Sequence, residues 1–184
     1  GRIDMILDAG PVHIGVESTI VDMTVDPPMI LRPGAVTKEM LEETVGEVAV
    51  DHTILAADSK TPPKAPGMKS RHYAPRAEMT VVEGPLERVV DKISELSAAR
   101  EEEGHRTGII ATRETMHRYS GKNVKCIGTR EDESTVAANL YAILRDFDDD
   151  GTEFIYSEAF ASDGIGSAVM NRLLKAAGHH VINV

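Results

Sequence analysis

Residues 79–111, MTVVEGPLERVVDKISELSAAREEEGHRTGIIA, switch from a strand pattern to a helix pattern and back again. The apolar, β-branched run at 79–82 indicates a buried strand. A helix is expected from about Pro85 to Glu103, because its apolar residues recur at helical spacing, a proline suits its first turn and Gly104 ends it. Thr107 to Ala111 then form a second buried strand. Two strands joined through a helix predict a parallel sheet with a right-handed crossover.

The same alternation of strands and helices continues along the rest of the chain. The expected elements are a short helix at 113–119, a strand at 124–127, a helix at 134–147, a strand at 154–158 and a last helix at 165–177. Strands separated by helices at this spacing imply a parallel sheet with helices on both faces. We therefore predict an α/β domain, a small doubly wound parallel sheet, over residues 77–184.

Residues 1–50 have a different, strand-rich pattern. The expected elements are strands at 3–8, 19–23 and 28–32 and a short helix between its cap Thr37 and its stop Gly46. Fewer than about 55 residues seldom bury enough surface to fold alone. We interpret this part as the C-terminal remnant of a larger β-rich domain. The strand-like start at Gly1 adds the expectation that the chain is the later piece of something longer.

Between these parts, residues 51–76 form a linker rich in proline and positive charge. Its four prolines and Gly67 rule out a helix or the interior of a sheet. The segment from Lys60 to Arg76 contains no Asp or Glu, in a chain whose formal net charge is −10. Its cations are Lys60, Lys64, Lys69, Arg71 and Arg76. This local reversal of charge suggests that the linker faces an anionic ligand.

The composition is that of a soluble globular protein, with 41% of the 184 residues hydrophobic and 27% charged. The acidic total argues against nucleic-acid binding over the whole surface, because such binding needs lysine and arginine to neutralise phosphate. The single cysteine, Cys126, cannot form an internal disulfide, and no apolar run is long enough to span a membrane. A cytoplasmic protein without membrane contact is the simplest expectation.

Two polar residues lie beside strands where a ligand could bind. Ser18 follows Gly15 just before the strand at 19–23, and Arg32 leaves the strand at 28–32 just before a Pro-Gly turn. The planar fork of a guanidinium matches phosphate. The alternatives are a turn hydroxyl that bonds its own backbone and an arginine that pairs with a surface carboxylate.

Three further features carry weaker signals. Gly164-Ile165-Gly166 lacks the third glycine of a dinucleotide-binding loop, so close packing of a helix start is the preferred interpretation. The run Asp148-Asp149-Asp150 is interpreted as a solvated acidic turn rather than a cation site. His179-His180 has no Cys or acid at ligand spacing, and no protein metal site is predicted.

Four motifs in order resemble one protein family, the threonylcarbamoyl-AMP synthases of the longer YrdC-related type. They are GVESTIVD at 15–22, LRPGA at 31–35, PGMKSRHYAP at 66–75 and the glycine-rich helix at 164–177. The resemblance implies a YrdC-type catalytic domain, with residues 1–50 as its remnant, followed by the linker and a smaller Rossmann-like domain. This agrees with the organisation inferred from the residues.

The resemblance also implies an activity. A nucleotidyltransferase of this family makes threonylcarbamoyl-AMP from L-threonine, bicarbonate and ATP with release of pyrophosphate, and a downstream transferase then modifies an adenosine of tRNA. By motif, Ser18 is expected to contact L-threonine, and Arg32 and Tyr73 to contact ATP, which binds with Mg²⁺. No catalytic residue is assigned, because the chemistry suits positioning and charge stabilisation rather than covalent catalysis.

Two upstream elements of the family, Lys-x-Arg and Ser-x-Asn, are not found before Ser18. The 184 residues alone are therefore expected to be inactive as a synthase. Two other readings stay open: a noncatalytic module that gates the site or docks a partner, and a module that binds tRNA or double-stranded RNA through the basic linker. Unpaired strand edges also allow a homodimer.

Overall fold

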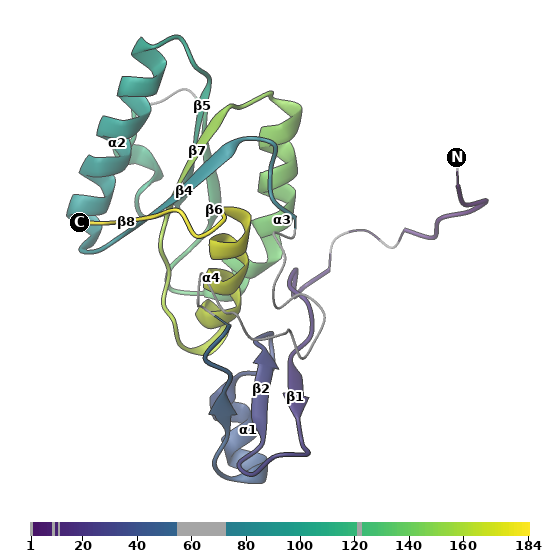
Figure 1. Ribbon diagram of the computed structural model, residues 1–184. Helices are drawn as coiled ribbons and strands as arrows, with labels where there is room; N and C mark the ends of the chain where they lie inside the picture. Colours follow the sequence, from purple (N-terminus) through teal and green to yellow (C-terminus); the bar gives the residue numbers. More distant parts are fainter. Residues whose placement is uncertain (1, 9, 11, 55–72, 121–122) are drawn as a thin grey trace.

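The computed structural model describes residues 2–8, 10, 12–54, 73–120 and 123–184. Figure 1 shows a small β-rich unit, formed by the purple and blue part of the chain, and a larger α/β unit in teal, green and yellow. Most of the predicted linker falls on residues 55–72, which lie outside the described residues. The structure therefore bears on the linker prediction only at its two ends.

The larger unit is built on a five-stranded sheet in which every pair is parallel, as the alternating pattern predicted. Its strand order is β6-β5-β7-β4-β8. The strands are β4 (Glu78–Glu83), β5 (Thr107–Thr112), β6 (Val124–Gly128), β7 (Phe154–Glu158) and β8 (Val181–Asn183). The last strand was not predicted, and it joins the edge of the sheet by pairing with β4.

Helices cover both faces of this sheet, which confirms the doubly wound prediction. They are α2 (Leu86–Glu102), α3 (Glu133–Asp149) and α4 (Gly164–Ala176). On one face, Val89, Val90 and Ile93 of α2 are buried against the sheet. On the other, α3 and α4 pack together over a larger core that contains Phe147 and Leu173 (Figure 1). Among the described helices, none combines the length and the apolar character needed to cross a bilayer.

A glycine in β5 allows α3 to lie close to the sheet. A Cβ on Gly108 would lie 2.7 Å from Cδ1 of Phe147, whose side chain is fully buried. The aromatic ring therefore occupies the space that any other residue at this position would need.

A buried carboxylate connects the loops at the C-terminal edge of the sheet. Glu158 ends β7 and is fully buried. It accepts hydrogen bonds from the hydroxyl of Thr115, from the phenol of Tyr119 at 2.8 Å and from Nη2 of Arg130 at 2.6 Å. A carboxylate can be buried at low cost only when it is paired and hydrogen-bonded in this way.

The smaller unit holds three short strands and one helix. β1 (Ile20–Asp22) and β2 (Met29–Arg32) are antiparallel, and β3 (Ala49–Val50) joins β2 in parallel. As predicted, Thr37 caps α1 (Lys38–Val45) and Gly46 ends it with a φ of 85°. The buried core cluster of this unit consists of Ile30, Val48 and Ile54. Because so small a core stabilises little, the unit depends on contacts with its surroundings.

Two expected elements are corrected. Residues 3–8 form no strand; they extend away from both units in Figure 1, and Leu7 is 91% exposed. Within the described residues no strand lies beside them to complete a ladder, and an unpaired strand is not stable in water. The helix expected at 113–119 is only the 3₁₀ turn Met116–Arg118.

The acidic run at the end of α3 is only in part the solvated turn that the sequence predicted: Asp149 and Asp150 are exposed, but Asp148 is not. The Asp148 side chain is only 7% exposed. It accepts a hydrogen bond from the backbone N–H of Arg76 at 2.6 Å and pairs with Arg145 at 2.8 Å, while Asp150 pairs with Lys125 at 2.6 Å. The run therefore anchors the last residue of the predicted linker to the larger unit.

Candidate functional site

The structure brings Ser18 and Arg32 together, two residues that the sequence singled out separately. Antiparallel pairing places Ile20 opposite Arg32, so Ser18 lies just beyond the end of β2. Arg32 donates from Nε to the backbone carbonyl of Ser18 at 3.0 Å and from Nη2 to its hydroxyl at 3.2 Å. The two side chains thus form one polar group at the end of the small sheet.

The Pro33-Gly34 turn packs directly on the backbone around Ser18. A Cβ on Gly34 would lie 2.5 Å from the carbonyl oxygen of Glu17 and 2.5 Å from the nitrogen of Thr19. Such distances are far below van der Waals contact, so only glycine fits without moving one of the two segments. The glycine of this motif therefore sets how closely the segment that carries Arg32 approaches the segment that carries Ser18.

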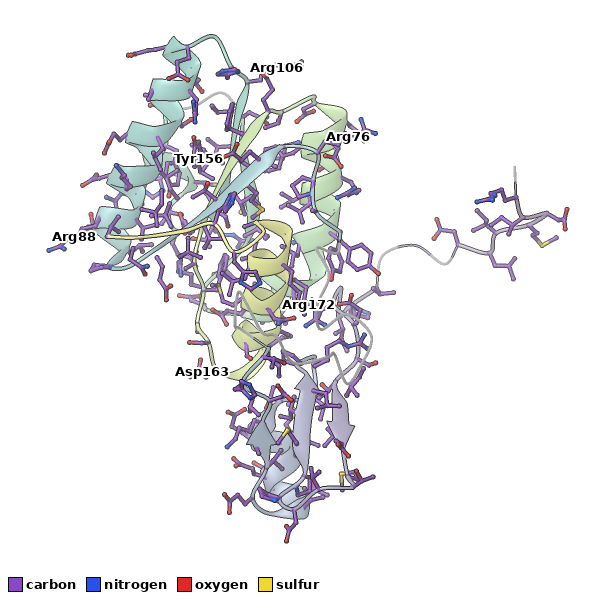
Figure 2. All side chains as sticks on the ribbon, viewed as in Figure 1. Arg76, Arg88, Arg106, Tyr156, Asp163 and Arg172 are labelled. Carbon is purple, nitrogen blue, oxygen red and sulfur yellow. The ribbon has the colours of Figure 1, made fainter. Side chains whose placement is uncertain are left out.

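Two helices of the larger unit hold Glu17, the residue before Ser18. Arg172 of α4, labelled at the junction of the units in Figure 2, donates from Nε to Oε2 of Glu17 at 2.8 Å. The phenol of Tyr141 in α3 donates to the same oxygen at 2.9 Å. Burial would raise the pKa of Glu17, but a hydrogen bond from its own backbone and the charge of Arg172 outweigh burial and lower the pKa. Glu17 is therefore a carboxylate at neutral pH.

Positive charge gathers on the same side of the junction. Lys175, one turn after Asn171 in α4, donates to the side-chain oxygen of that residue at 3.0 Å. Burial and the charges of Arg172 and Arg32 lower the pKa of Lys175 to about 8, and attraction to Glu17 offsets this only in part. Lys175 thus interacts with two arginines and one carboxylate, which is a local excess of positive charge.

Tyr73 reaches this site through the larger unit. Its backbone is held by Arg145, which donates from Nη2 to the carbonyls of Tyr73 at 2.8 Å and Ala74 at 3.1 Å. Its ring lies 4.6 Å from the ring of Tyr141, centroid to centroid. Since Tyr141 also bonds Glu17, a continuous line of contacts joins Tyr73 to the Ser18–Arg32 pair. Tyr73 has a φ of 57°, an uncommon backbone conformation for a residue other than glycine.

The sequence analysis missed the residues that make this connection. Arg172 and Asn171 lie between apolar residues in the middle of α4 and are 6% and 1% exposed. Adjacent polar residues within an apolar helix are the signal that could have identified them, because such residues are buried only with partners. Glu17, the partner of Arg172, lies 155 residues away, and Ile54, whose carbonyl accepts from Asn171, lies 117 residues away, so no local pattern could have predicted these contacts.

A cavity of about 370 Å³ lies beside the site, between the two units. Its walls include Pro33 and Gly34 from the turn after Arg32, Thr37 at the start of α1, and Gly164 at the start of α4. Figure 2 labels Asp163, another lining residue, at the lower end of α4. A space of this size can hold a small molecule.

Of the two glycines at the start of α4, Gly166 is the one that close packing requires. A Cβ on Gly166 would lie 2.5 Å from the carbonyl oxygen of Ala161, so the helix start is pressed against the preceding loop.

Burial lowers the pKa of His179, the first residue of the histidine pair. Within the part of the chain that the structure describes, no group of three or more His, Cys, Asp or Glu is arranged to hold a metal ion.

The chain matches known proteins along its whole length. A family model described as "Threonylcarbamoyl-AMP synthase, C-terminal domain" matches residues 36–178. The threonylcarbamoyl-AMP synthase of Bacillus subtilis is 44% identical over 182 residues, which are 99% of this chain and 51% of that protein. The enzyme of the same name from Pyrococcus abyssi is 44% identical over 184 residues, 100% of this chain and 52% of that protein. The chain spans about half the length of the curated relatives it matches.

Two solved structures of Pyrococcus abyssi Sua5 share the fold. The one complexed with L-threonine superposes with a TM-score of 0.88 at 41% identity, covering 100% of this chain and 52% of that chain. The other is a variant in which a histidine and the tyrosine after it are both replaced by alanine; its TM-score is 0.84 at 41% identity, over 94% of this chain and 48% of that chain. By sequence and by fold, this chain belongs to the threonylcarbamoyl-AMP synthase C-terminal domain family.

Proposed function

We propose that this chain works within an L-threonylcarbamoyladenylate synthase, which joins L-threonine, bicarbonate and ATP into threonylcarbamoyl-AMP and releases pyrophosphate. The observation that carries the proposal is the Ser18–Arg32 pair, held at the junction of the units in a chain whose relatives bear this enzyme name. The chain spans about half the length of those relatives, so the activity is proposed for the longer polypeptide. We expect these 184 residues alone to release no pyrophosphate.

The proposed reaction needs positioning more than covalent help. The amine of threonine combines with bicarbonate to give a carbamate and water, and a carbamate oxygen then attacks the α-phosphate of ATP as pyrophosphate leaves. In this scheme the hydroxyl of Ser18 contacts threonine, and the guanidinium of Arg32 contacts the phosphate that gains charge in the transition state. Mg²⁺ enters with ATP and neutralises charge on the departing pyrophosphate.

Tyr73 is the third proposed ligand contact, on the ATP side of the site. Support comes from its line of contacts through Tyr141 to Glu17. The solved Pyrococcus abyssi variant adds support, since it replaces adjacent histidine and tyrosine, and His72-Tyr73 is the one such pair in this sequence. We also propose residues 1–50, 51–76 and 77–184 as catalytic remnant, linker and C-terminal domain.

Calorimetric titration of the complete polypeptide tests these assignments. L-threonine should bind at least tenfold more weakly to Ser18→Ala than to wild type, and Mg-ATP at least tenfold more weakly to Arg32→Ala and Tyr73→Phe. Arg118→Gln, which removes an exposed arginine pair with Glu87 on the α2 side of the larger unit, is the matched control and should bind both ligands normally. Wild-type affinity in all three site variants would refute the assignments.

A second candidate function is a gating or docking module without chemistry of its own. The observation in its favour is that α3 and its end hold the backbone of Tyr73, Ala74 and Arg76, the described end of the linker. Such a module should change the activity of a separate catalytic half when the 184-residue chain is added. Binding of tRNA or double-stranded RNA, the downstream transferase, a homodimer and the cytoplasmic location stay predictions.

A further inference from the structure

Arg172 contacts both segments that carry the proposed ligand-binding residues. It belongs to α4 of the larger unit, and its side chain is 5% exposed. Besides the bond from Nε to the Glu17 carboxylate, it donates from Nη1 to the carbonyl of Pro33 at 2.7 Å. It therefore contacts the residue just before Ser18 and the residue just after Arg32.

Each end of this arrangement is fixed by more than one contact. On the Glu17 side, Nη2 of Arg172 also lies 3.5 Å from the backbone carbonyl of Glu17, and Tyr141 bonds the same carboxylate. On the helix side, the side-chain oxygen of Asn171 accepts a bond from Nη1 at 3.2 Å, which holds the guanidinium in place. An arginine side chain with one plane and several bonds of this kind has little freedom to move.

The segments that Arg172 holds have little support of their own. β1 has three residues and β2 has four, and the core cluster behind them has three buried side chains. Arg32 and Ser18 are joined to each other by two hydrogen bonds, but those bonds do not fix where the pair lies relative to the larger unit. The bonds from Arg172 to Glu17 and Pro33 help to fix the position of the pair relative to the larger unit.

We propose that Arg172 is a positioning residue for the adenylate-forming site: by holding Glu17 and Pro33 from α4, it sets the relative placement of Ser18 and Arg32. The inference rests on the proposed function of those two residues. It gives the C-terminal domain a part in substrate binding without any contact to substrate, because displacement of a binding group by about 1 Å can lower a rate by about 100-fold.

The test compares Arg172→Gln, Arg172→Lys and Val169→Ala in the complete polypeptide. Gln removes the charge and the bonds to Glu17, whereas Lys keeps a charge that can reach one partner but not two. Val169 lies in the same helix and is fully buried in the core, and its apolar side chain can make no hydrogen bond to Glu17 or Pro33, so its truncation weakens the packing of α4 and leaves those bonds in place. Pyrophosphate release is measured at varied L-threonine and ATP, below the unfolding temperature of every variant.

Two readouts separate positioning from stability. We expect kcat/KM to fall about 10- to 100-fold in Arg172→Gln, with a smaller fall in Arg172→Lys and less than about twofold in Val169→Ala. Hydrogen exchange of the backbone in residues 15–22 should become faster in Arg172→Gln and not in Val169→Ala. Equal losses in Arg172→Gln and Val169→Ala, or unchanged kinetics in Arg172→Gln, would overturn the positioning role.

The design also separates this inference from the proposed function. If the wild-type polypeptide releases no pyrophosphate from ATP with threonine and bicarbonate, the proposed function fails, and the positioning role fails with it. If the wild type is active but Arg172→Gln behaves as Val169→Ala does, only the positioning role fails. Should Arg172→Gln not fold, Glu17→Gln removes the same ion pair from the other side and must reproduce the loss.

Discussion

The phenol of Tyr141 in α3 donates a hydrogen bond to Oε2 of Glu17 at 2.9 Å, across 124 residues of sequence. This bond helps to tie the larger unit to the segment that carries Ser18. It shares its acceptor with Arg172, so two helices converge on one carboxylate. The small unit is thus placed by polar contacts from the domain that follows it.

Removal of the Tyr141 hydroxyl tests this bond. Tyr141→Phe keeps the ring against Tyr73 and should lower the free energy of unfolding by about 1 kcal/mol, the usual net value of such a bond. Denaturation in urea, monitored by circular dichroism, measures the change. In the Glu17→Gln background, where the acceptor is altered, the same substitution should cost clearly less. Equal costs in the two backgrounds would show that the bond contributes nothing.

Gly34 should tolerate no larger residue. Gly34→Ala puts a methyl group 2.5 Å from the backbone of Glu17 and Thr19, and the resulting shift should cost about 1–3 kcal/mol of stability and weaken threonine binding. The control is Gly178→Ala, where the added methyl group meets open space and only the φ of 58° opposes it. Threonine affinity measured by calorimetry should fall in the first variant alone; a parallel fall in both would contradict the packing argument.

The stability of the protein should rise with pH where Lys175 loses its proton. Its pKa is about 8 in the folded chain against 10.5 when unperturbed, so between these values the unfolded state binds more protons and each rise in pH favours folding. Within the described residues, the charged and titratable groups that interact with it include Arg172, Arg32, Glu17 and His179. Because the amine is only half buried, the gain should be about 1 kcal/mol.

Lys175→Met provides the comparison. Urea unfolding at pH 7.5 and at pH 9.5, conditions chosen to bracket about pH 8 and to stay below the usual tyrosine range, should show a gain in the wild type that is absent from the variant. The variant should also be the more stable of the two at the lower pH. An identical pH dependence in both proteins would contradict the assignment of the low pKa to Lys175.

Glu158 should matter for folding and not for ligand binding. Glu158→Gln leaves the partly exposed guanidinium of Arg130 beside a neutral, buried amide, which should destabilise the chain by about 1–3 kcal/mol. Urea unfolding measures that loss. L-threonine affinity of the folded variant should be unchanged, since Glu158 lies at the sheet edge among Thr115, Tyr119 and Arg130 and not at the junction. A lower L-threonine affinity in fully folded Glu158→Gln would contradict this prediction and show that the Glu158 cluster contributes to ligand binding.

The fold of the larger unit could be predicted from the sequence because its signals are local. Each strand and helix carries its own apolar period, and the crossover rule then fixes the parallel sheet. β8 escaped prediction because its three residues are only partly buried and exposed at an edge. The strand predicted at 3–8 is absent because an apolar run needs a partner strand, and the partner is a matter of tertiary structure.

The candidate site shows the same division. Ser18 and Arg32 could be found from the sequence because hydroxyl and guanidinium groups beside turns indicate ligand contacts. The roles of Tyr141 and Arg172 depend on contacts between residues more than a hundred positions apart. The hydrogen bonds between Ser18 and Arg32 depend on the pairing of β1 with β2, which neither residue's local sequence specifies. The burial of Asp148 was not predicted for the same kind of reason, since its partner Arg76 lies 72 positions away in the sequence.

The most direct test of the central claim is pyrophosphate release by the complete polypeptide, with ATP, L-threonine and bicarbonate each omitted in turn. The account predicts release that requires all three substrates and falls at least 100-fold in Arg32→Ala at full folding. Release that continues without threonine, or that is unchanged in Arg32→Ala, would contradict it.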